Sequence, residues 1–249
     1  MMQLLWLRRA VVAMLVMLAL PVQAVEHPAI KYRIKLPPSA DLVYAVQFSQ
    51  HGLTLNGESV LRWRVSGNRY GLNNEMRSSL LGKAMESKSE GMIDAFGLAP
   101  LQLTEKRMRK PASSATFDRE HRLIRLTDAP QTYPLHGGEQ DRASIMLQLV
   151  SVARGAPQKF VSGSEWKFFV VGRKSAETWT FRVIRKEKIS TPMGEVQAVR
   201  ITRLLPEGSR EQQLELWLAP SLDWFPVRVS FHDADGTQSD QKLLRIEKK

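Results

Sequence analysis

The sequence has no cysteine in its 249 residues. This absence excludes disulfide bonds, thiolate zinc sites and cysteine nucleophiles together. A chain of this length can bury roughly 70–75% of its unfolded surface, so it can form a stable fold without covalent cross-links. Stability must therefore come from a hydrophobic core, and any chemistry from other residue types.

The sequence also lacks an apolar run long enough to cross a membrane. The longest run, Ala10–Leu20, has about half of the roughly 20 residues that a spanning helix needs. It follows the basic pair Arg8 and Arg9 and leads to a Val-Gln-Ala sequence that ends at Ala24. This order of zones predicts a signal peptide of residues 1–24, cleaved after Ala24.

The expected route of export is the general secretory route, because the rest of the twin-arginine pattern is missing. No cysteine lies near the cleavage site, so no residue is present for a lipoprotein anchor. We expect a periplasmic protein that is soluble after cleavage and has no permanent membrane anchor. Residues 25–249 should form a single β-rich domain.

Motifs for catalysis or metal binding are scarce. The five histidines, at positions 27, 51, 121, 136 and 232, have no spacing typical of metal ligands. Two S-x-x-K matches, Ser164–Lys167 and Ser239–Lys242, flank strand-like segments, where the serine and the lysine point to opposite faces. We therefore predict no catalytic residue, no metal site and no cofactor.

The mature chain is expected to be a basic protein. The sequence has 36 Lys and Arg against 25 Asp and Glu, and removing Arg8 and Arg9 leaves 34 against 25, or +9. In the envelope this charge favours anionic lipid headgroups, lipopolysaccharide phosphates or cell-wall polymers, and we expect no nucleic acid partner. The two basic clusters, 106–110 (KRMRK) and 185–188 (RKEK), are interpreted as solvated loops or strand edges.

Most of the chain alternates apolar and polar residues with the period of a β-strand. The clearest runs are Leu42–Phe48, Leu61–Val65, Trp179–Val183, Leu214–Leu218 and Val227–Phe231. Turn sequences such as Asn56-Gly57 separate them, and the segments 112–115 and 127–138 are interpreted as loops. The pattern predicts a mainly β fold, with a curved antiparallel sheet or an open half-barrel.

One segment has the period of a helix. Apolar residues follow helical spacing between Asp141, a suitable N-cap, and Gly155, a suitable stop, which predicts one packed α-helix at about 141–154. Gln140, Asp141 and Ser144 form a polar cluster at its start. This cluster either caps the helix or points toward the mouth of a ligand site.

Aromatic residues on the predicted strands form a second candidate site. In an open barrel, Trp63, Trp179, Phe181 and Trp217 could line an apolar ligand cavity. The alternative is that they form an ordinary core.

The order of several short motifs resembles a bacterial envelope family, the domain of unknown function 3108. The motifs are L-x-Y at Leu42, S-x-G at Ser89, G-L-x-P at Gly97, Q-D-x-x-S at Gln140, T-x-x-G at Thr191 and W-L-A-P at Trp217. The resemblance extends from about residue 40 to 247. It implies an exported protein of unestablished activity and supplies no catalytic residues.

The expected architecture is also similar to that of the periplasmic lipoprotein carriers and their outer-membrane receptor, which implies an unclosed barrel around a hydrophobic cavity. We therefore expect a non-enzymatic binding or carrier module for an apolar or amphipathic envelope component such as a lipid. Two alternatives stay open: a scaffold that binds an envelope protein through a sheet edge, and a hydrolase whose acid pair has no fixed spacing. An apolar pocket would favour the carrier, and a filled core the scaffold.

Overall fold

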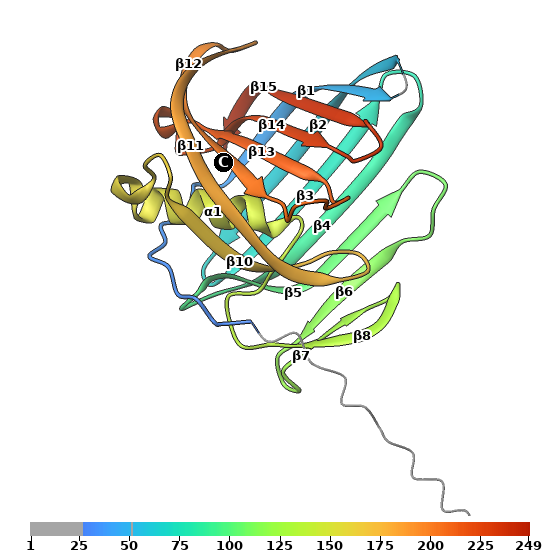
Figure 1. Ribbon diagram of the computed structural model, residues 1–249, viewed down its shortest axis with the longest axis vertical. Coiled ribbons are helices and arrows are strands. Elements are labelled where there is room, and N and C mark those ends of the chain that lie inside the picture. Colours follow the sequence, from blue (N-terminus) through green and yellow to red (C-terminus); the bar gives the residue numbers. More distant parts are fainter. Residues whose placement is uncertain (1–26, 51) are drawn as a thin grey trace, which may run out of the picture.

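The computed structural model describes residues 27–50 and 52–249, so the predicted signal peptide, residues 1–24, lies outside the described residues. The described chain forms fifteen strands, one α-helix and two short 3₁₀ helices (Figure 1). The strands are β1 (Ala40–Gln50), β2 (Leu53–Ser66), β3 (Arg69–Ser78), β4 (Gly82–Asp94), β5 (Gly97–Arg107), β6 (Ser113–Asp118), β7 (Leu123–Leu126), β8 (Ala129–Pro134), β9 (Gln140–Asp141), β10 (Glu165–Val171), β11 (Ala176–Thr191), β12 (Gly194–Leu204), β13 (Gln213–Leu218), β14 (Pro226–His232) and β15 (Gln238–Lys248). The α-helix is α1 (Ser144–Gly155), and the 3₁₀ helices are Pro157–Lys159 and Pro220–Leu222.

All these strands belong to one sheet, in the order β8-β7-β6-β5-β4-β3-β2-β1-β15-β14-β13-β12-β11-β10-β9. Neighbours are antiparallel except for the short β9, which pairs in parallel with β10. The first strand pairs with the last, with Ala40 opposite Lys248 and Ser49 opposite Gln238. The two halves of the sheet therefore extend in opposite directions from the β1–β15 pair.

The sheet curls around α1 until its two ends approach each other (Figure 1). Phe117 of β6, Ile124 of β7 and Tyr133 of β8 share a hydrophobic cluster with Phe169 and Val171 of β10. No ladder pairs β8 with β9 in the described part of the chain, so the barrel is open. These features confirm the predicted mainly β fold with one packed helix.

Helix α1 packs against both halves of the sheet. Leu149 belongs to a cluster with residues of β10–β14, and Leu147 to a cluster with residues of β1–β3. The helix begins at Ser144, later than the predicted start at Asp141, because Gln140 and Asp141 form β9. It ends at Gly155 as expected, where a Cβ atom would lie 2.4 Å from the carbonyl oxygen of Arg33.

The structure corrects three local predictions. Asn56-Gly57 is not a turn but lies inside β2, and a Cβ atom on Gly57 would lie 2.2 Å from the carbonyl oxygen of Arg77 in β3. The glycine therefore permits a close approach of two strands. The expected loops 112–115 and 127–138 overlap β6 and contain β8, because proline and small polar residues near a sheet edge resemble turn sequences.

Candidate ligand cavity

The antiparallel order brings several turns to one end of the barrel, which we call the mouth. The β1–β2 and β3–β4 turns follow the pairs Ser49–Thr54 and Ser78–Gly82. The β14–β15 turn lies beside the first of these, since Ser49 also pairs with Gln238. In Figure 1 these turns lie at the right, together with the β5–β6 turn, and α1 lies at the left.

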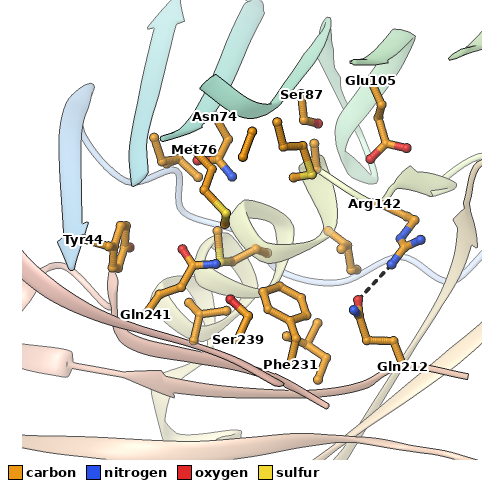
Figure 2. A pocket seen from close by; sticks show the side chains of 18 of the residues that line it. Tyr44, Asn74, Met76, Ser87, Glu105, Arg142, Gln212, Phe231, Ser239 and Gln241 are labelled. Carbon is orange, nitrogen blue, oxygen red and sulfur yellow. Dashed lines mark hydrogen bonds between the residues drawn. The ribbon is translucent and has the colours of Figure 1, made fainter. Parts of the chain in front are cut away.

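A cavity of about 390 Å³ lies between the start of α1 and the strand ends at the mouth (Figure 2). Most of its wall is apolar. The apolar lining residues are Tyr44, Phe48, Leu61, Leu72, Met76, Ala84, Met85, Met108, Ala143, Ile145, Met146, Trp179, Leu214, Leu216, Val229 and Phe231. Four of them are methionines, whose unbranched, polarisable side chains let a wall adapt to the shape of an occupant.

One side of the cavity is charged. The half-buried Arg142 donates a 3.0 Å hydrogen bond from Nη2 to Oε1 of Gln212, and no carboxylate of the described residues forms an ion pair with it. Burial lowers the pKa of Arg142, and the nearby charge of Glu105 partly offsets this effect. The guanidinium therefore has donor capacity that the protein leaves unused.

Glu105 stands on the same side of the cavity (Figure 2). Its residue is 7% exposed, and its Oε2 has no hydrogen-bond partner among the described residues. The hydroxyls of Thr237, just before β15, and of Ser239, at the start of β15, also belong to the cavity lining and are buried without a partner in the described chain. Because buried polar atoms are normally hydrogen-bonded, these groups mark a place where an occupant could supply partners.

Among the predicted cavity aromatics, only Trp179 lies in the cavity wall. The guanidinium carbon of Arg203 lies 3.9 Å from its ring centroid, which fixes the indole at the edge of the cavity. Phe181 is fully buried in the core beside Phe168. Trp63 is also fully buried, and its Nε1 donates to the carbonyl oxygen of Pro37 at 3.2 Å.

Trp217 belongs to the opposite face of β13 from the cavity-lining Leu214 and Leu216. Its Nε1 donates to Glu187 at 2.6 Å, and Arg228 lies 4.6 Å from its ring centroid. The alternation of residues located these strands, but it could not identify the concave face. Nor did any sequence signal point to the cavity methionines or to Arg142.

The polar cluster at the start of α1 is buried and does not line the cavity. Asp141 accepts hydrogen bonds from the backbone of Ala143 and Ser144 through Oδ1, and from Ser89 Oγ through Oδ2 at 2.5 Å. Ser144 Oγ donates to Gln140 Oε1 at 3.0 Å. The N-cap is Ala143, so the prediction that Asp141 is the N-cap is wrong. The Asp141 carboxylate nevertheless binds the first backbone N–H groups of the helix.

Burial raises the pKa of Asp141 to about 6, although the hydrogen bonds from Ser89 and the helix start oppose this shift. Tyr70 extends the network, since its hydroxyl lies 3.0 Å from Ser89 Oγ. In the described part of the chain, no group of three or more histidine, aspartate or glutamate residues could hold a metal ion. Two carboxylates, those of Glu105 and Asp233, line the cavity.

The fold and the cavity together define an open β-barrel with an apolar interior that is accessible from one end. The chain belongs to the family described as a protein of unknown function (DUF3108), whose model matches residues 43–242. A comparison with curated proteins gives no match.

Comparison with solved structures gives matches at low identity. A β-barrel-like protein of the domain of unknown function DUF1849 from Brucella abortus is 12% identical, with a TM-score of 0.55 over 87% of this chain and 99% of that one. A protein from Bacteroides fragilis described as exported, with a YmcC-like fold, is 10% identical, with a TM-score of 0.34 over 88% and 100%. A domain from Vibrio parahaemolyticus described as outer-membrane lipoprotein-sorting is 7% identical, with a TM-score of 0.25 over 84% and 85%. The Brucella structure supports the fold; the other two are too distant to carry an argument.

No helix in the described ranges is both long enough and apolar enough to span a membrane.

Proposed function

We propose that this protein is a non-enzymatic, periplasmic binding or carrier module for an amphipathic molecule of the cell envelope. The observation that carries the proposal is the 390 Å³ cavity, whose wall is mostly apolar and whose charged groups gather on one side. Ligand pockets commonly have volumes of roughly 300–1,000 Å³, with apolar walls and a few polar groups that orient the ligand.

The apolar wall would hold the chain of the ligand. Burying apolar surface contributes roughly 25 cal/mol per Å², so an acyl chain that covers the side chains around Ile145 and Phe231 would bind favourably. The four methionines would allow chains of different length or branching.

The charged side would hold the head of the ligand. Arg142 offers free N–H donors and Glu105 a free carboxylate oxygen, so a head that both accepts and donates hydrogen bonds fits this wall. The predicted signal peptide implies a periplasmic location, which would bring the protein to such molecules.

The scaffold alternative receives less support from the sheet edges. The edge strand β8 contains Pro130 and Pro134, and proline cannot donate a hydrogen bond to an added strand. The other edge, β9, has only two residues. Neither edge offers a long pairing surface.

The test is a titration of delipidated, monomeric protein with a dansyl-labelled fatty acid, alongside native mass spectrometry of protein purified from its own periplasm. Met85→Trp and Met146→Trp place a larger side chain in the cavity and should weaken binding at least about tenfold, or about 1.4 kcal/mol. Met193→Trp, at an exposed methionine outside the cavity, is the matched control and should bind normally. If the native protein shows no saturable binding and carries no co-purified lipid, the carrier proposal fails and the scaffold replaces it.

A further inference from the structure

The apolar side chains that the fold leaves exposed are concentrated at the mouth. Leu53 at the β1–β2 turn and Leu80 at the β3–β4 turn are 74% and 75% exposed. Leu81 beside Leu80, and Met108 at the β5–β6 turn, are also exposed. These four residues, which we call the mouth tips, are more than half of the seven large apolar residues exposed in the described chain.

The mouth tips belong to the same hairpins that build the cavity. The β1–β2 hairpin contributes Phe48 to the cavity wall, the β3–β4 hairpin contributes the paired Met76 and Met85, and the β5–β6 turn contributes Met108 itself. Each hairpin thus carries apolar residues from the cavity wall to an exposed apolar tip. Scattered exposed leucines need no explanation, but a group around the opening of an apolar cavity indicates a contact surface.

The positive charge of the 106–110 cluster at the mouth indicates which kind of partner this surface contacts. All residues of the basic cluster 106–110 are exposed, and none of its four cations forms an ion pair with a described residue. In the other basic cluster, near the opposite end of the sheet, Arg185 pairs with Glu187 and Lys188 with Glu195. Unpaired cations beside exposed leucines are typical of an interfacial segment that contacts anionic lipids.

We propose that the mouth docks on an anionic lipid bilayer, with the mouth tips inserted at the headgroup level and the 106–110 cluster against the lipid phosphates. In this orientation the cavity opens toward the membrane, so an apolar chain could pass between bilayer and cavity without crossing water. The docking surface does not depend on which ligand the cavity binds, and it therefore goes beyond the proposed function.

The test is co-sedimentation with vesicles of equal parts phosphatidylcholine and phosphatidylglycerol, and with vesicles of phosphatidylcholine alone. The wild-type protein should bind the anionic vesicles, and added salt should weaken this binding because it screens the lipid charge. The variant with Leu53→Ser, Leu80→Ser and Leu81→Ser should bind at least about tenfold more weakly, since it loses the apolar insertion. The matched control, Val161→Ser with Met193→Ser, changes exposed apolar residues away from the mouth and should bind like the wild type.

A second pair of variants tests the charge. Arg109→Gln with Lys110→Gln should weaken binding to anionic vesicles by about fivefold for each cation removed. Lys186→Gln with Lys188→Gln, in the other basic cluster, should have little effect. All these positions are exposed, so thermal unfolding should confirm that every variant is folded.

Three outcomes would overturn the proposal. The first is wild-type protein that ignores anionic vesicles, and the second is mouth variants that bind as well as their controls. The third is self-association of the wild-type protein together with a monomeric leucine variant. That result would make the mouth an interface between two copies of the chain. Binding of the dansyl-labelled fatty acid in solution should be unchanged in the leucine variant, so a failure of docking is distinguishable from a failure of ligand binding.

Discussion

Two neighbouring residues at the start of α1, Asp141 and Arg142, have opposite surroundings. Asp141 is fully buried, and both of its carboxylate oxygens accept hydrogen bonds from Ser89 or from the start of the helix. Arg142 lines the cavity and has a single hydrogen bond to a neutral side chain, that of Gln212. The Asp141 carboxylate thus has its partners within the protein, whereas the Arg142 guanidinium faces the cavity without an anionic partner among the described residues.

The difference separates a structural role from a binding role. A buried polar group whose bonds are all made within the chain fixes the position of the elements it joins. A charged group that is partly desolvated and left without an anion gains most when a ligand supplies the missing partner. The comparison predicts that changes at Asp141 act on stability, whereas changes at the Arg142 wall act on binding.

The largest expected effect is that of Asp141→Ala. It leaves the backbone N–H groups of Ala143 and Ser144 and the hydroxyl of Ser89 without their acceptor, and each unpaired buried group costs about 1–3 kcal/mol. We expect urea denaturation to show a loss of about 3–5 kcal/mol, more than the 0.5–2 kcal/mol of an ordinary helix cap. The control Asp118→Ala removes a partly exposed aspartate that also binds a backbone N–H, and it should cost less. Normal stability with weakened ligand binding would instead assign the Asp141 cluster to the ligand site.

The pH dependence of stability gives the next largest effect. The folded protein raises the pKa of Asp141 from its ordinary 3.8 to about 6, so the folded state takes up a proton more readily than the unfolded chain. The contribution of Asp141 therefore favours folding increasingly as the pH falls from about 6 to about 4, by up to about 3 kcal/mol. Carboxylates with lowered pKa values, such as Asp223, act in the opposite direction.

The comparison of the wild type with Asp141→Asn isolates this contribution. Asparagine keeps an acceptor for the helix start but does not titrate. The stability of the wild type relative to the variant should rise as the pH falls through this window. A difference that is constant with pH, or that falls, would contradict the raised pKa.

The contrast between these regions also explains what the sequence could reveal. The period-two runs predicted β1, β2, β11, β13 and β14, because one face of each strand carries large apolar residues. Strand β4 gave no such signal, since its buried positions include Ser87, Ser89 and Gly91. Ser89 bonds to Asp141, and a Cβ atom on Gly91 would lie 2.3 Å from the carbonyl oxygen of Ala99, so neither position can take a large apolar side chain.

The candidate site was harder to predict than the fold. The cluster of Gln140, Asp141 and Ser144 could be found because capping chemistry is local in sequence. The cavity combines residues from strands and turns that are far apart in the chain, and whether an aromatic residue faces it depends on sheet curvature. For this reason Trp179 lines the cavity, whereas Trp217 faces the other side of the sheet.

Replacement of Arg142 tests the binding half of the comparison. Arg142→Leu removes a half-buried cation that has no anionic partner in the described chain, so stability should change by less than about 1 kcal/mol. Binding of the dansyl-labelled fatty acid, whose carboxylate would pair with the guanidinium, should weaken about tenfold. Arg154→Leu, the control at the other end of α1, breaks an ion pair with Asp223 and should lower stability without changing binding. Equal effects of both variants on binding would remove the distinction between the two arginines.

The smallest expected effect concerns another charge in the cavity wall, that of Glu105. Glu105→Gln keeps the shape of the side chain and removes a negative charge that faces the same space as Arg142. Loss of this like charge should strengthen the binding of a fatty acid about threefold and should weaken the binding of an alkylamine of the same length, because the two heads carry opposite charges. Glu90→Gln, at an exposed position of β4, should change neither affinity. Opposite responses of the two amphiphiles would place the ligand head beside Glu105. If both affinities change in the same direction, Glu105 acts through the shape or stability of the wall, and the charged side of the cavity does not select the head.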